Sequence, residues 1–180
     1  MLKHALLFAA LALASPASAD LRISYADGDR PLFSVAVPDF WSIETGGARA
    51  ISPPGEEAAL PVPQIVTLRP TVEPDVWMGF FSPPGISTLE GGLDYLSEIE
   101  KFMAAEPEIT SISKGQVAGM AARIIKGTGR RDGSDIAYTI AVVDLPGARV
   151  AIAAAVAETT AAPALIDEIN RVFASMRAGS

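Results

Sequence analysis

Two consecutive segments near the C-terminal end carry uncharged side chains on both of their faces. In residues 136–143 bulky side chains alternate with alanine and threonine, and residues 149–157 repeat the alternation with valine, isoleucine and alanine. A period of two is typical of β-strands, and the loop at residues 145–147 is short enough only for antiparallel neighbours. Apart from Arg149 neither segment carries a charged side chain. These residues therefore predict a sheet whose two faces are both covered by other parts of the protein.

The rest of the chain supplies further short strands. They are expected at residues 21–25, 32–37, 48–52, 64–68, 76–81 and 121–126, between proline- and glycine-rich turns. Residues 53–63 are expected to form a surface loop. Ten of the 14 prolines lie between Pro31 and Pro84, so the N-terminal half should consist of short strands joined by ordered loops.

Two amphipathic helices are predicted to cover this sheet. From Ser87 the apolar period changes to about 3.6, which predicts a helix over residues 87–103, with Ser87 and Glu90 as a capping box. The last helix is expected to be capped by Thr160 and to hold Pro163 in its first turn. The predicted fold class is α+β, an α/β/α sandwich with a central, mainly antiparallel β-sheet flanked by helices on both faces.

The first 19 residues have the three parts of a secretory signal. These parts are the basic residues Lys3 and His4, the apolar residues 5–14, and the small residues Ala17, Ser18 and Ala19. The apolar run is about half of the roughly 20 residues that a transmembrane helix needs. We therefore expect cleavage between Ala19 and Asp20. The product, residues 20–180, would be a single domain of the bacterial periplasm that is not inserted in the membrane.

The composition after this expected cleavage excludes several classes of function. The chain has no cysteine, and His4, its one histidine, would leave with the signal. Nucleophile arrangements that use histidine or cysteine are thereby excluded, as are nearly all zinc, copper and haem sites, so no cofactor is expected. Without Lys3, 13 basic and 21 acidic side chains remain, a net charge of −8. This acidic balance disfavours nucleic acid and anionic lipid as partners.

Several segments occur in an order that resembles the PsbP-like family. They read FSVAVPDFW at residues 33–41, STLEGGLDYLSEIEKFM at residues 87–103, VAGMAARII at residues 117–125 and EINRVFASMR at residues 168–177. This family is named for an extrinsic subunit of photosystem II, and it shares its fold with a Ran-binding nuclear import factor and with small bacterial envelope proteins. The resemblance covers nearly all of residues 20–180 and implies one domain with a non-enzymatic binding or assembly role. Its motifs are structural, and they name no partner.

Four residues are candidates for a binding surface. Aromatic residues gather in the N-terminal half, and most of them should pack in the core. If Trp77 or Phe81 is exposed, however, it becomes the best candidate for contact with a partner. Arg130 and Arg131 form the one basic cluster, at the tip of a predicted hairpin, where arginines are usually solvated.

Other motifs have simpler structural interpretations. Ser111 and Lys114 match the S-x-x-K pattern of penicillin-recognising enzymes, but a strand would point them to opposite faces, and the companion motifs are absent. Asp132 and Asp135 flank a predicted turn, and their carboxylates are candidates for a weak cation site. The ligands are, however, too few for a calcium loop. Turn chemistry is therefore the favoured interpretation of these two residues.

The sequence therefore predicts an exported, non-enzymatic binding or accessory protein of the bacterial periplasm. Its partner would be another envelope protein or a small ligand. The alternative is a carboxylate-based hydrolase that acts on an envelope glycan or peptide, because the separation of carboxylates cannot be read from sequence. This alternative requires a cleft with two carboxylates about 5–9.5 Å apart.

Overall fold

The computed structural model describes residues 20–47, 49–51, 60–62, 64–73, 76–99 and 105–179. The predicted signal, residues 1–19, lies outside the described residues. So do residues 48 and 52 of a predicted strand, residues 53–59 and 63 of the predicted loop, and residues 100–103 of the first predicted helix.

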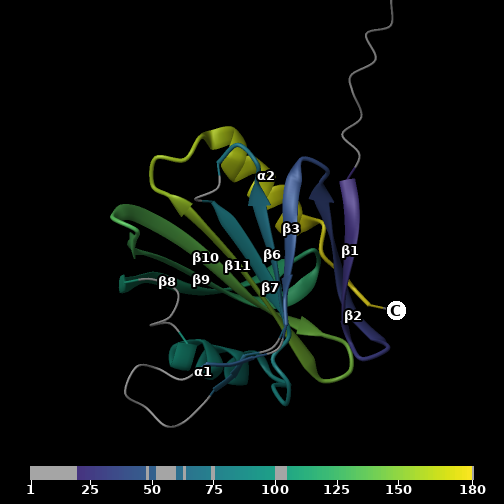
Figure 1. The fold of residues 1–180 in the computed structure, drawn as a ribbon. Coiled ribbons are helices and arrows are strands. Elements are labelled where there is room, and N and C mark those ends of the chain that lie inside the picture. Colours follow the sequence, from purple (N-terminus) through teal and green to yellow (C-terminus); the bar gives the residue numbers. More distant parts are fainter. Residues whose placement is uncertain are drawn as a thin grey trace, which may run out of the picture.

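Seven strands form the main sheet, which fans out across the molecule (Figure 1). In spatial order they are β3 (Trp41–Gly46), β6 (Ile65–Pro70), β7 (Trp77–Phe81), β11 (Arg149–Glu158), β10 (Ser134–Leu145), β9 (Met120–Arg131) and β8 (Ala105–Val117). All neighbouring strands are antiparallel. The prediction of an α+β fold with a mainly antiparallel sheet is therefore confirmed.

Two smaller sheets accompany the main one. β1 (Asp20–Asp27) and β2 (Arg30–Pro38) form a hairpin around a turn at Gly28 and Asp29, and β12 (Arg177–Ala178) pairs with the other edge of β2. β4 (Arg49–Ile51) pairs with β5 (Leu60–Val62), which lies in a segment that we expected to be a loop.

Helix α1 (Leu89–Ile99) packs against the bulky face of the main sheet. The ring centroids of Tyr95 on α1 and Phe81 on β7 are 6.2 Å apart. Gly92 lies so close to Val142 that an added Cβ would overlap the valine side chain. The missing side chain thus brings the helix axis close to the sheet, and this explains a glycine that would otherwise only weaken the helix.

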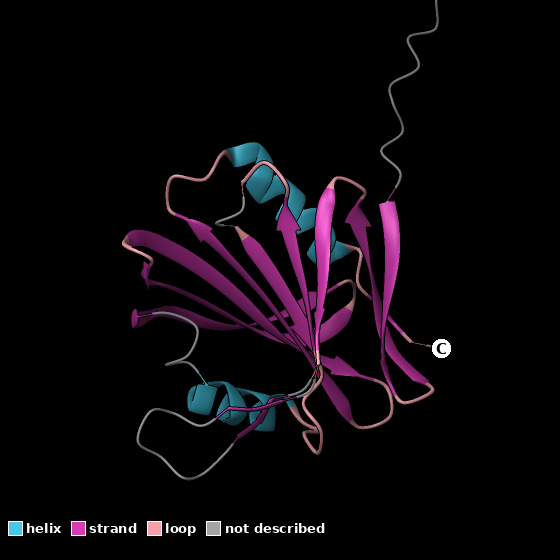
Figure 2. Ribbon diagram, viewed as in Figure 1, coloured by secondary structure: helices cyan, strands magenta, loops and turns pink. Residues whose placement is uncertain are grey.

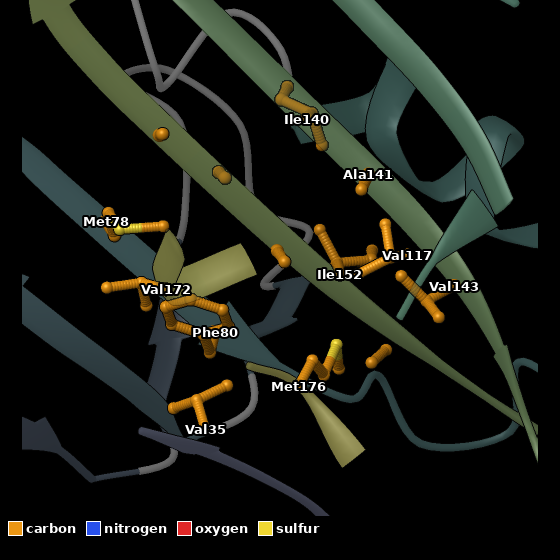
Figure 3. Close-up of a cluster of buried hydrophobic side chains, with 14 of the residues drawn as sticks. Val35, Met78, Phe80, Val117, Ile140, Ala141, Val143, Ile152, Val172 and Met176 are labelled. Carbon is orange, nitrogen blue, oxygen red and sulfur yellow. The ribbon is translucent and has the colours of Figure 1, made fainter. Parts of the chain in front are cut away.

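The opposite, alanine-rich face of the main sheet is buried by a layer that contains both a helix and strands. Phe80 projects from this face beside Ala153, and its ring centroid lies 6.2 Å from that of Phe173 on helix α2 (Pro163–Ala174). Val35 of β2 belongs to the same buried cluster (Figure 3).

The predicted sandwich therefore needs correction, because the second layer includes the small β1–β2–β12 sheet besides a helix. Strands make up most of the described molecule (Figure 2). Within the described part of the chain, no helix is long and apolar enough to cross a membrane.

Both predicted helix caps are also corrected. At the start of α1 the backbone N–H of Gly91 donates a hydrogen bond of 3.0 Å to the Thr88 hydroxyl, so Thr88 is the cap in place of Ser87. Glu90 instead pairs with Arg123 of β9 at 2.6 Å. Helix α2 has Ala162 at its N-cap position and no side-chain cap, but Pro163 does occupy its first turn, as predicted.

Candidate binding surface

An apolar cavity of about 120 Å³ lies between α1 and the end of the main sheet near β8. The helix contributes Leu93, Leu96 and Ser97 to its lining. The sheet contributes four isoleucines of β8, β9 and β10 together with Tyr138. Among the described lining residues only Ser97 and Tyr138 carry polar side-chain groups, so the cavity suits an apolar group.

The alternation of β10 creates this lining. Tyr138 and Ile140 project from the same face as Val142, which contacts α1, and the neighbouring strand β9 adds Ile125 opposite Ile140. Gly127 is the partner of Tyr138 in the ladder, and an added Cβ there would overlap the tyrosine ring and the carbonyl oxygen of Glu108. The tyrosine ring therefore lies across the bare backbone of β9.

Two isoleucines of β8 form the solvent-facing rim of the cavity. Ile109 is 44% exposed and Ile112 is 56% exposed, although both line the cavity. Single exposed isoleucines are common on protein surfaces, but two of them beside an apolar cavity form a concave apolar patch. Sequence analysis missed this patch. A strand near Ser111 was predicted, but nothing in the sequence shows which strand ends the sheet.

Trp77 and Arg131 lie on the same face of the sheet as this cavity. Trp77 pairs with Val156, and Val156 pairs with Tyr138, so all three side chains project to the same side. The Arg131 guanidinium carbon lies 5.4 Å from the Trp77 ring centroid, within the range of a cation–π contact. An added Cβ at Gly79 would lie 2.9 Å from Cζ3 of Trp77, so the indole rests on the backbone of its own strand.

The other two predicted binding residues do not join this group. Phe81 is only 6% exposed and packs against Tyr95, so it belongs to the core. Arg130 interacts within its own hairpin, at 3.7 Å from Asp135 and 3.3 Å from the carbonyl oxygen of Gly133. The structure thus brings together Trp77 and Arg131 but neither of the other two candidates.

The turn carboxylates and the S-x-x-K match have structural interpretations. Asp132 lies 3.7 Å from Arg131, and Asp135 lies 3.7 Å from Arg130. In the part of the chain that the structure describes, no group of three or more potential metal-binding side chains is found. The register of β8 places Ser111 and Lys114 on opposite faces, as a strand requires.

A partly buried polar cluster joins the N-terminal hairpin to the main sheet, and sequence analysis missed it. Arg149 at the start of β11 pairs with Asp27 of β1 at 2.6 Å and donates a 3.1 Å hydrogen bond to the Ser82 hydroxyl. That hydroxyl donates in turn to the carbonyl oxygen of Val150 at 2.7 Å. The residues are 122 and 67 positions apart in sequence, so no local pattern predicts their contact.

Tyr25 lies beside this cluster. Its hydroxyl donates a 2.9 Å hydrogen bond to the carbonyl oxygen of Gln64, and its ring stacks on Phe33 with centroids 4.9 Å apart. Burial raises the pKa of Tyr25, and this effect outweighs the lowering by a backbone hydrogen bond at Ser82 and by the charge of Arg149. Burial also raises the pKa of Tyr95 on α1.

Comparisons with known proteins place the fold. No protein-family model matches the sequence, and no curated protein does either. Among solved structures, cyanobacterial PsbP from Synechocystis sp. PCC 6803 is similar, with a TM-score of 0.55 and 10% identity over 93% of this chain and 97% of that one.

Two further solved structures are similar over much of the chain. A protein from Bacteroides thetaiotaomicron has a TM-score of 0.50 and 13% identity over 82% of this chain and 45% of that one. LpqN from Mycobacterium tuberculosis, described as involved in cell envelope biogenesis, has a TM-score of 0.47 and 17% identity, over 90% of this chain and 91% of that one. The similarity to PsbP confirms what the sequence motifs predicted, namely that the chain has a PsbP-like fold.

Proposed function

We propose that the protein is an exported, non-enzymatic binding or accessory protein of the bacterial periplasm that binds its partner at the α1–β8 surface. The α1–β8 surface is the 120 Å³ cavity together with its rim residues Ile109 and Ile112. The observation that carries the proposal is this pairing of an apolar cavity with an exposed apolar rim. Burial of a partner's apolar groups in such a site is favourable, and the described residues that line it include no side chain suited to acid–base catalysis at neutral pH.

The chemistry of the chain supports the non-enzymatic part of this proposal. After removal of residues 1–19, neither histidine nor cysteine remains for nucleophilic or general acid–base catalysis. The PsbP-like fold adds a framework but no function, because one fold serves many activities. Trp77 and Arg131 lie on the same sheet face and extend the surface available to a partner.

The hydrolase alternative gains no support from the cavity. The described residues that line it include no aspartate or glutamate, whereas a glycosidase site needs two carboxylates that flank the scissile bond.

A comparison of two matched lysine variants tests the proposed surface. Purified residues 20–180 are used to capture partners from envelope extracts. Ile112→Lys places a charge on the rim, whereas Ser113→Lys places the same charge on the next exposed residue of β8, which faces the other side of the sheet. We expect the wild type and Ser113→Lys to capture the same protein and Ile112→Lys to lose it, because a lysine ammonium resists desolvation.

Two results would contradict the proposal. One is capture of the same partner by all three proteins, which would place the binding site elsewhere. The other is steady turnover of an envelope substrate by the purified protein that is abolished by changing a single Asp, Glu, Ser or Lys.

A further inference from the structure

Strand β8 ends the main sheet. One of its edges pairs with β9, and its other edge pairs with no strand among the described residues. At 13 residues it is about twice as long as β3, the strand at the opposite end, which has six. A long edge strand with unpaired backbone groups is a template for a further strand.

The two halves of β8 differ in regularity. The register shifts between Ala105 and Glu108 and again between Ile109 and Ser111, and such bulges discourage pairing at an edge. From Ser111 to Val117 the ladder with β9 runs without interruption over seven residue pairs. The regular half is therefore the part of the edge that can extend the sheet.

The regular half borders the apolar cavity. Ile112 pairs with Ile125 and lines the cavity, and alternation places Lys114 and Gln116 on the same face. Every second side chain of an added strand would project toward this face, beside the Ile112 rim. Strand addition combines backbone hydrogen bonds with pockets for alternate side chains, and this edge offers both features.

Lys114 occupies the centre of the regular half. It is exposed, and the ion pairs of the described residues do not include it, whereas the opposing Arg123 is paired with Glu90. Antiparallel pairing of Ser111–Val117 with a second copy would, at full overlap, place Lys114 directly opposite the same lysine of the other copy. Like charges directly opposite are destabilising, whereas an acidic side chain there is favourable. The charge thus disfavours self-association and favours an acidic partner strand.

We infer that Ser111–Val117 binds an extended segment of a partner protein as an eighth strand of the main sheet. The segment carries apolar side chains at alternate positions, one of which contacts Ile112 at the cavity, and an aspartate or glutamate that faces Lys114. This inference rests on the proposed function and specifies the chemistry of its partner.

A peptide selection tests the inference without knowledge of the natural partner. A displayed library of random seven-residue peptides is selected on purified residues 20–180, and the enriched peptides are synthesised. We expect alternating apolar residues with at least one acidic residue. In NMR titrations the largest amide shifts should fall on Ser111–Val117, and these amides should become protected from hydrogen exchange.

Charge reversal then tests the role of Lys114. Lys114→Glu should weaken the binding of an acidic selected peptide by about threefold or more at low salt, and it should strengthen binding of the same peptide with its acidic residue replaced by lysine. Lys126→Glu is the matched control. Lys126 is an exposed lysine of β9 whose side chain faces the other side of the sheet, and its reversal should change neither affinity appreciably.

The inference is overturned if no peptide is enriched, or if the selected peptides shift amides away from β8. It is also overturned if sedimentation shows a dimer whose second copy protects Ser111–Val117, or if only small apolar molecules fill the cavity. These results contradict strand addition at β8 but leave the proposed function standing, provided that Ile112→Lys still fails to capture the partner that the wild type captures. If Ile112→Lys also captures the partner as well as the wild type does, both proposals are contradicted.

Discussion

Three glycines of this protein lie where a bare backbone closely approaches a large side chain. Gly92 brings α1 onto Val142, Gly79 supports the Trp77 ring, and Gly127 supports the Tyr138 ring. From sequence these residues look like sources of flexibility in a helix and in strands. Their packing role depends on which side chain crosses them, which only the tertiary structure determines.

Gly127→Ala tests this role. The added methyl group would overlap the Tyr138 ring and a β8 carbonyl oxygen, so we expect the free energy of unfolding to fall by about 1–3 kcal/mol. Urea denaturation measures the change. Gly47→Ala is the control, because Gly47 is exposed and nothing lies within 4 Å of an added Cβ. Equal stability of the two variants would contradict the close packing at Tyr138.

Tyr25 should make the protein sensitive to alkaline pH. Because its pKa is raised in the folded state, the unfolded chain releases this proton first as the pH rises through about 10. Its contribution to stability is therefore complete below pH 10 and is lost above it. The slope is at most about 1.4 kcal/mol per pH unit for one proton.

Denaturation of the wild type and of Tyr25→Phe at several pH values checks this expectation. The phenylalanine variant should be less stable at pH 8, because it loses the hydrogen bond to Gln64, but its stability should fall less steeply above pH 10. Identical alkaline slopes would show that Tyr25 does not titrate differently in the two states.

At the scale of secondary structure, the strands were easier to predict than the helix ends. Residues 136–143 and 149–157 alternate so regularly that β10 extends beyond the first segment by only two residues at each end, and β11 extends beyond the second by only one residue, at its C-terminal end. The cap of α1 was placed one residue too early, because Ser87 and Thr88 are both good caps and only backbone geometry selects between them.

Paired alanine substitutions distinguish the two caps. Thr88→Ala should lower the free energy of unfolding by about 0.5–2 kcal/mol, since the Gly91 N–H loses its acceptor. Ser87→Ala should change it by less than about 0.5 kcal/mol, as expected for an exposed residue away from such features. Urea denaturation of both variants measures these changes. A larger loss of stability in Ser87→Ala than in Thr88→Ala would show that Ser87 is the cap.

The candidate surface was the least predictable feature at this scale. Trp77 and Arg131 were chosen for their residue type, and the structure does place them in contact. Ile109 and Ile112 were missed, because an isoleucine in a strand usually points into a core. Their exposure follows from the position of β8 at the end of the sheet. That position depends on strand order, which the alternation within one strand does not encode.

At the scale of the whole molecule, export is the prediction that most affects function. Residues 1–19 fused to a phosphatase that is active only after export should yield active enzyme in a Gram-negative bacterium. N-terminal sequencing of the full-length protein from the periplasm should begin at Asp20. Ala17→Arg should prevent cleavage, because the site requires a small side chain there. Uncleaved wild-type protein in the cytoplasm would contradict the assignment.

The pairing of β12 with β2 has a consequence for the order in which the chain can finish folding. Arg177 and Ala178 pair with Ser34 and Phe33, and the N–H of Gly179 donates to the carbonyl oxygen of Leu32 at 2.8 Å. One edge of β2 thus pairs with residues that follow it much later in the sequence. Until residues 177–179 are in place, this edge of β2 stays open, so the small sheet is completed only after two segments far apart in the sequence have met.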